Sequence, residues 1–271
     1  MIEFDLSLFQ RWLSLFAFPL SRIFGFVASA PIWATGGLPK QIRLMLGLSM
    51  VLCLAPVIPE TQIPNINPAS GHGLEILATQ MLVGICMGLS ARIIFAAVDV
   101  AGEYIGYQMG LGFATFYDPI DSAQSPVMAE LLTLIGILLF LAFNGHLMYV
   151  LTLSKSFTII PVSDFANTFG VKNFAHLANL GSIMFSLGLS LCMPVVITLL
   201  VFNVALGVLT RASPQLNIFA LGFPITLLGG FILMWFSMHT MMPFMEHIFS
   251  VLVDSILAFI NPNVVTVPVA K

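Results

Sequence analysis

The sequence predicts an all-α polytopic membrane protein built from about six long, kinked hydrophobic helices. Of the 271 residues, 59% are hydrophobic and only 8% are charged, and the mean hydropathy is +1.03. A soluble domain carries roughly 25% charged residues, so this chain has too few charges to cover a surface that faces water. Its apolar residues also gather in runs that reach the ~20 residues a helix needs to cross the hydrocarbon core.

The N-terminal half holds four of the predicted spans. They cover residues 12–34, 44–58, 74–100 and 131–153. The chain starts with MIEFDLSLF, whose Glu3 and Asp5 do not fit the positive start of a secretory signal, so we expect the first span to remain in the mature protein. Pro, Asn and Gly mark residues 59–73 as a connector, and 110–126 and 154–172 form the other long links.

The C-terminal half holds the other two spans, inside uncharged runs of 38 residues (173–210) and 34 residues (212–245). Both runs are longer than one perpendicular crossing requires. We expect residues 248–260 to form a separate amphipathic piece. Prolines inside apolar runs are predicted to kink or break their helices. These are Pro19, Pro194, Pro224 and Pro243.

The distribution of Lys and Arg gives no orientation. With six spans, three basic residues fall on one side (Lys40, Arg43, Arg211) and four on the other (Arg11, Lys155, Lys172, Lys271). Simple insertion into a bilayer usually leaves a bias toward one side. Its absence favours helices that are held by partner proteins.

Three charges in the third span share one helix face, because Arg92, Asp99 and Glu103 are separated by seven and four residues. Such groups are costly in hydrocarbon unless they pair or face protein. One interpretation is a buried ion-pair seam between packed helices, and the other is a proton or ion relay. Arg22 in the first span has the same two interpretations, with snorkelling toward the interface as a third.

Glycines recur every four residues in and before the segment AGEYIGYQMG, which ends the third helical region. They are Gly84, Gly88, Gly102, Gly106 and Gly110. Small residues at this spacing let two helix backbones approach closely in a membrane. We therefore predict helix packing at Gly84, Gly88, Gly102 and Gly106.

The connector GLGFATFYDPIDSAQSP (110–126) combines loosened backbone with bulky side chains. Gly110 and Gly112 are candidate hinges, and Asp118–Pro119 breaks any helix. Phe113, Phe116 and Tyr117 are the bulky residues. Irregular backbone at membrane depth must be buried in protein or line a cavity. The segment is therefore suited to plugging a pore, with an ordinary surface loop as the alternative.

Nothing in the sequence indicates catalysis, a cofactor or a metal site. His239, Glu246 and His247 lack the spacing of a helical metal site. The cysteines stand singly in apolar runs and are interpreted as small buried hydrophobic residues. They are Cys53, Cys86 and Cys192. A net charge of −3 excludes the basic footprint of a nucleic-acid-binding protein.

Four stretches together resemble the FliR family of flagellar export proteins. They are SRIFGFVASAPIWATGGLPKQIRLML, GYQMGLGFATFYDP, LLFLAFNGHLMYV and RASPQLNIFALGFPI. The similarity covers nearly the whole chain in the same order, and the polar block RASPQLNIFALGFP is the most specific part. The related virulence secretion systems share a looser version, so the flagellar branch is the better match.

The resemblance implies a subunit of the flagellar type III secretion export gate. It implies one copy assembled with five FliP and several FliQ subunits and contacted by FlhB, in the bacterial inner membrane of the flagellar basal body and partly raised toward the periplasm. Unfolded flagellar subunits would pass through this assembly, and membrane lipid would surround part of it. Residues 1–170 would form a FliP-like part and residues 171–271 a FliQ-like helical hairpin.

The resemblance also implies that residues 106–126 form the loop that plugs the closed pore, with Gly110, Gly112, Phe113, Phe116, Tyr117, Asp118 and Pro119 as its gating residues. The main alternative function is a small-solute secondary transporter or ion channel that uses Arg92, Asp99 and Glu103. No internal repeat of the kind common in transporters is visible. An enzyme acting on lipid is a weaker alternative, because the sequence offers no arrangement of nucleophile and base.

Overall fold

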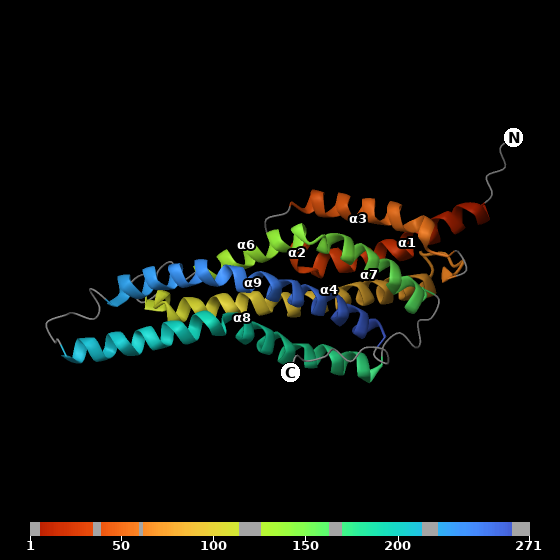
Figure 1. The fold of residues 1–271 in the computed structure, drawn as a ribbon. Helices are drawn as coiled ribbons and strands as arrows, with labels where there is room; N and C mark the ends of the chain where they lie inside the picture. Colours follow the sequence, from red (N-terminus) through yellow and green to blue (C-terminus); the bar gives the residue numbers. More distant parts are fainter. Residues whose placement is uncertain are drawn as a thin grey trace. The chain divides into compact units, whose positions relative to one another are not determined.

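The structure, a computed structural model, describes residues 6–34, 39–59, 62–113, 126–162, 170–212 and 222–261. Helices account for nearly all of the regular structure in these ranges, which contain no strand, so the all-α class is confirmed. The α-helices are α1 (Leu6–Ser29), α2 (Pro31–Ala34), α3 (Lys40–Leu54), α4 (Gly71–Gln108), α6 (Val127–Ala142), α7 (Gly145–Ile159), α8 (Val171–Ala212) and α9 (Phe223–Ile260), with 3-10 turns η1 (Ala55–Val57) and η3 (Leu111–Phe113) (Figure 1).

Five of the described helical segments are long and apolar enough to cross a membrane, and α6 with α7 can supply a sixth crossing. The predicted span at 131–153 is divided between α6 and α7, which are bent by 69° at a break between them. The break lies at Asn144, whose φ of 57° is left-handed. Asn is one of the few residues that adopts this conformation readily.

Three helices are much longer than one crossing requires. Helices α4, α8 and α9 contain 38, 42 and 38 residues, which corresponds to about 57–63 Å at 1.5 Å per residue, against about 30 Å of hydrocarbon. Helix α4 already begins inside the predicted connector 59–73. The separate piece predicted at 248–260 does not exist, since α9 runs unbroken to Ile260.

The prolines interrupt fewer helices than predicted. Helices α1, α8 and α9 continue through Pro19, Pro194 and Pro243. Pro224 lies in the first turn of α9, where the missing N–H has no helical partner in any case. Neighbouring helices can compensate for a lost backbone bond in a membrane protein.

The chain divides into two compact units that do not follow chain order. The first contains Met1–Ile94, Asn144–Gly181 and Ser250–Lys271, and the second contains Phe95–Phe143 and Ser182–Phe249. Helices α4, α8 and α9 are each divided, with one part in the first unit and the rest in the second.

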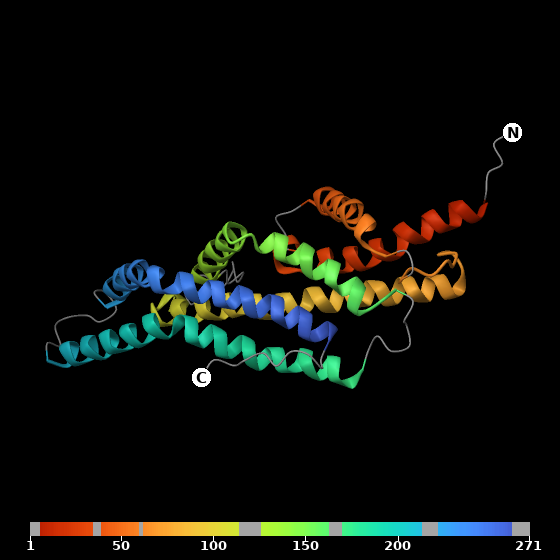
Figure 2. The ribbon, with the colours of Figure 1, turned by 45° about the vertical axis from the view of Figure 1, so that its right-hand side comes forward.

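In the first unit, α1 lies beside α7 and the first half of α4 (Figure 2). Phe26, Trp33 and Tyr149 form an edge-to-face aromatic cluster with ring centroids 5.3–5.7 Å apart. Helix α3 packs on α1, where Gly47 faces the ring of Phe24. Aromatic rings of α1, α2 and α7 therefore pack together in this unit, and α3 approaches α1 at a glycine.

In the second unit, the second half of α4 contacts three helices. Gly102 of α4 lies against Ala129 of α6, and Gly188 of α8 lies against the Ala97 carbonyl of α4. The ring of Phe249 on α9 stacks with Phe95 at 6.5 Å between centroids. The second half of α4 thus packs against α6, α8 and α9.

Candidate functional site

Helix α4 ends directly before the segment that the sequence predicts to be a plug. The Met109 N–H donates to the Ile105 carbonyl (2.9 Å), and the Gly110 N–H donates to the Tyr107 carbonyl (3.0 Å). Gly110 has a φ of 83°, the left-handed conformation in which helices commonly end and which glycine adopts without steric cost. The chain turns at Gly110 and continues into the short η3 turn.

The structure describes only the first of the predicted plug residues. Gly110 and Gly112 lie within the described ranges, and a Cβ on Gly112 would lie 3.5 Å from the Tyr107 ring. The backbone of Phe113 ends η3. Phe116, Tyr117, Asp118 and Pro119 lie outside the described residues. The plug therefore stays a prediction.

Side chains from α8 and α9 satisfy the last carbonyls of α4. Asn203 of α8 donates from Nδ2 to the Gln108 carbonyl at 3.3 Å. The Thr226 hydroxyl of α9 is shared between the carbonyls of Met109 (3.4 Å) and Phe223 (3.0 Å). A helix leaves its last four carbonyls without helical partners, so these two side chains fill that need.

Packing reinforces these hydrogen bonds. The Met109 side chain is fully buried, and it lies against Gly230 of α9, where an added Cβ would be 2.5 Å from Cγ and 2.9 Å from Sδ of Met109. We refer to Gln108, Met109, Asn203, Thr226 and Gly230 together as the α4 anchor. Sequence reasoning missed Asn203 and Thr226, although each is a polar residue within an uncharged apolar run.

The three charges of the predicted seam differ in their surroundings. Arg92 and Glu103 are exposed on α4, whereas Asp99 is half-buried. Thr133 of α6 donates a hydrogen bond from its hydroxyl to Asp99 Oδ1. Asp99 is thus tied to α6, and the pairing of the three charges stays a prediction.

The predicted packing glycines lie at close helix contacts in three of four cases. A Cβ on Gly84 would collide with the Arg22 carbonyl of α1, one on Gly88 with the Ser29 hydroxyl, and one on Gly102 with Ala129 Cα. At Gly106 the nearest atom is Met128 Cβ at 3.5 Å, an ordinary contact. Helix α1 therefore crosses α4 with almost no space between the two backbones.

Arg22 joins three helices in the first unit. Its side chain is completely buried. Nε donates to Gln80 Oε1 of α4 (2.7 Å), one terminal nitrogen donates to the Ser156 carbonyl (2.9 Å), and the other donates to the Ile160 carbonyl (2.8 Å). The guanidinium also lies 4.4 Å from the centroid of the Phe157 ring.

The position of Arg22 excludes snorkelling and favours a packing role. Its hydrogen-bond acceptors within the described residues are neutral amide, hydroxyl and carbonyl oxygens. Two of them are carbonyls at the C-terminal end of α7, where the helix dipole is negative and favours a cation. The Ser156 carbonyl also accepts the Ile160 N–H (2.9 Å), so Arg22 adds a second donor there, and it supplies a donor to the Ile160 carbonyl beyond the end of the helix.

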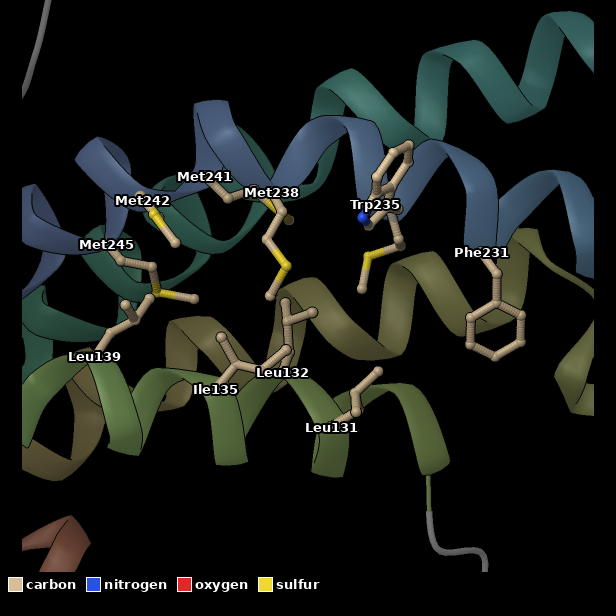
Figure 3. A pocket seen from close by; sticks show the side chains of 11 residues that line it. Leu131, Leu132, Ile135, Leu139, Phe231, Trp235, Met238, Met241, Met242 and Met245 are labelled. Atoms are coloured by element: carbon tan, nitrogen blue, oxygen red, sulfur yellow. The ribbon is translucent and has the colours of Figure 1, made fainter.

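Methionines line an apolar groove of about 180 Å³ between α6 and α9 in the second unit. Its lining consists of Leu131, Leu132, Ile135, Leu139, Phe231, Met234, Trp235, Met238, Met241, Met242 and Met245. Figure 3 shows Met238 and Met245 extending from α9 toward Leu132 and Leu139 of α6. Flexible thioethers fill irregular apolar space readily. The described residues contain no group of three or more His, Cys, Asp or Glu side chains arranged to hold a metal ion.

Comparison with known proteins points to one family. The sequence profile of "Bacterial export proteins, family 1" matches residues 13–252. The Flagellar biosynthetic protein FliR of Escherichia coli (strain K12) is 38% identical over 250 residues, which cover 92% of this chain and 94% of the relative. Its namesake in Pectobacterium carotovorum subsp. carotovorum is 39% identical over 94% and 95% of the two chains. The namesake in Bacillus subtilis (strain 168) is 29% identical over 92% and 94%.

Proposed function

Because the chain belongs to the FliR family of bacterial export proteins, we propose that it is the single-copy subunit of a flagellar type III secretion export gate. The observation that carries this proposal is the similarity itself, which spans residues 13–252 and therefore covers all or most of every long helix. The chain is a membrane-embedded protein of flagellar export, with five to six candidate spans. Within that role we propose a structural part, without catalysis of its own.

The proposed assembly contains five FliP and several FliQ subunits, contacted by FlhB, and it conducts unfolded flagellar subunits. Two features of the chain indicate that its helices contact partner proteins as well as lipid. Helices α4, α8 and α9 are about twice as long as one membrane crossing. Charged residues also stand exposed on the long apolar helix α4 at Arg92 and Glu103, where solvation by hydrocarbon would be costly. We place the assembly in the inner membrane and partly raised toward the periplasm.

The proposed mechanism is passive. Residues 106–126 block the resting pore, with Phe113, Phe116 and Tyr117 as the bulky occluding side chains and Gly110 and Gly112 as hinges. Engagement of a substrate moves aside the part of the segment that follows the hinge glycines, and the energy comes from elsewhere in the machine. The left-handed turn at Gly110 supports a hinge at this position. A difference of about 1.4 kcal/mol between the closed and open states changes the open fraction roughly tenfold.

Deletion of residues 110–120 tests the plug. We expect the assembled gate to leak small ions at rest, because the obstruction is gone, and ion flux across vesicles or cells that carry the full complex measures it. Replacing Phe113, Phe116 and Tyr117 by serine keeps the segment's length and should raise the leak as well. Stoichiometric co-purification of the mutated chain with its partners is the control for assembly. Unchanged conductance in an assembled deletion variant would show that the segment is no plug.

A further inference from the structure

We propose that the α4 anchor is a fixed pivot of the gate, and that Asn203, Thr226 and Gly230 are positioning residues which hold the start of the segment that follows Gly110. This inference rests on the proposed function of that segment and adds the part that holds it in place. The anchor lies entirely within the second unit. It is distinct from the hinge glycines and from the bulky residues of the proposed plug.

The hydrogen bonds of the anchor give the first reason. The carbonyls of Gln108 and Met109 are the last two before the left-handed turn at Gly110, and α8 and α9 each supply one donor to them. A carbonyl without a partner is costly inside an apolar membrane protein. Moving the end of α4 away from either helix would expose one of these carbonyls, so the position of this end is specified from two sides.

The packing of Met109 gives the second reason. Its side chain is fully buried, and a Cβ added at position 230 would lie 2.5–2.9 Å from three of its side-chain atoms, so any larger residue there must displace the Met109 side chain. A Cβ on the neighbouring Gly229 would make an ordinary contact with Phe202 Cε1 at 3.8 Å. Of these two adjacent glycines, Gly230 is therefore the one at which a Cβ would collide with the Met109 side chain.

The sharp change in backbone conformation gives the third reason. Helix α4 runs to Gln108, and the Met109 N–H is still hydrogen-bonded to the helix at the Ile105 carbonyl. At Gly110 the φ of 83° redirects it. Rotation about the Gly110 backbone changes the course of the following residues without disturbing Met109. A rigid support followed at once by a permissive residue has the arrangement of a pivot.

Substitutions at the two glycines test the pivot. Gly230→Ala and Gly230→Val should push Met109 out of place and raise the resting ion leak of the assembled gate, the valine more than the alanine. Gly229→Ala and Gly229→Val change the helix propensity equally but touch nothing at the anchor, and they should leak as the unmodified gate does. Equal leaks from the two matched pairs would overturn the proposal, provided that both co-purify with their partners.

A disulfide tests the same contact without a collision. In a chain whose native cysteines are replaced by alanine, Met109→Cys with Gly230→Cys places two Cβ atoms within about 4 Å, a separation that a disulfide accepts. We expect the reduced double variant to leak, because the packing is lost, and oxidation to remove the leak while export continues. Met109→Cys with Gly229→Cys should not respond to oxidation. Export that stops on oxidation and resumes with reductant would show that the anchor must open, which contradicts a fixed pivot.

The two proposals fail in different ways. If deletion of residues 110–120 leaves conductance unchanged, the plug is wrong, and disulfide formation at 109–230 but not at 109–229 still decides whether the anchor contact exists. If the deletion leaks but the Gly230 variants behave as their Gly229 counterparts do, the plug stands and the pivot is wrong.

Discussion

A fully buried arginine with neutral acceptors is unusual, because removing a cation from water is costly unless hydrogen bonds replace the lost hydration. Arg22 meets this requirement with acceptors on α4 and at the end of α7. The guanidinium is suited to the task since its donors form a planar fork, whereas a lysine ammonium is compact and strongly hydrated. Arg22 therefore ties together the three helices that meet around it.

Replacing Arg22 should destabilise the protein. Arg22→Met removes the buried donor to Gln80 Oε1 and to the Ile160 carbonyl, so we expect a loss of about 3 kcal/mol in the free energy of unfolding, and Arg22→Lys should recover only part of it. Arg211→Lys at the exposed end of α8 is the matched control and should change stability by less than about 0.5 kcal/mol. Thermal unfolding of the purified complex in detergent measures the difference. Wild-type stability of both Arg22 variants would contradict this account.

The charges on α4 separate the export function from the transporter alternative. Asp99→Asn with Glu103→Gln should weaken co-purification with partner subunits if these carboxylates pair in a seam. We expect no solute flux through the chain alone, before or after the change. A flux through the purified chain that these substitutions abolish would favour the transporter. Arg92→Gln, which removes the predicted counter-charge, should weaken assembly in the same way.

For single residues, the sequence predicts better which side chains have a special role than which partners they contact. Arg22 attracts notice as a charge in an apolar run, but its acceptors at Ser156 and Ile160 are 134 and 138 residues away. No local pattern reports such a distance. Asn203 and Thr226 escape notice for the same reason, because each resembles an ordinary small polar residue until α8 and α9 are brought to the end of α4.

Several helices of this chain cross at glycines, and at the crossing of α1 and α4 a Cβ on Gly84 or Gly88 would collide with α1. Gly84→Ala would press a methyl group into the Arg22 carbonyl, and we expect it to cost about 1–3 kcal/mol, the typical cost of overpacking. Gly207→Ala on α8 has open space around it and should stabilise its helix by about 0.5–1 kcal/mol. Thermal unfolding should therefore show a lower stability for Gly84→Ala and a higher stability for Gly207→Ala, although both substitutions add the same methyl group. Equal shifts would show that helix propensity alone decides.

The sequence predicts that the long helices exist, but it predicts their first and last residues less well. The apolar runs place the spans correctly because hydrocarbon thickness sets a minimum length. The break inside 131–153 was missed, although Asn144–Gly145 is a strong turn pair, because hydropathy continues smoothly across it. At Pro243 the predicted break does not occur, because α9 continues through it, and a kink at this residue stays a prediction.

On the scale of the whole chain, large apolar side chains stand on surfaces that no other described part of the chain covers. Met45 on α3 is 71% exposed and Val201 on α8 is 66% exposed. Along α8 more than half of each of five apolar side chains is exposed: Ile197, Leu200, Val201, Val204 and Val208. An apolar helix face of this kind marks contact with lipid or protein. Helices α4, α8 and α9 are also about twice as long as one membrane crossing, so we expect part of that surface to contact protein.

We therefore expect the chain to co-purify in fixed stoichiometry with other small hydrophobic membrane proteins after mild detergent extraction. Val201→Asp and Val204→Asp on the exposed face of α8 should reduce this recovery, whereas Val201→Leu should not. Quantitative mass spectrometry of the purified complex measures the ratios. A stable, monodisperse single chain from the same extraction would count heavily against a subunit of an export gate.

The groove between α6 and α9 carries a chemical vulnerability. Five of the 15 methionines of the chain line it. Peroxide converts a thioether into a sulfoxide, a strong dipole in a place built for alkyl groups. Met242 is 43% exposed whereas Met245 is 2% exposed, so damage would begin at the rim and advance inward. Oxidative stress would thus loosen α6 from α9, and sulfoxide reductases would be needed to reverse it.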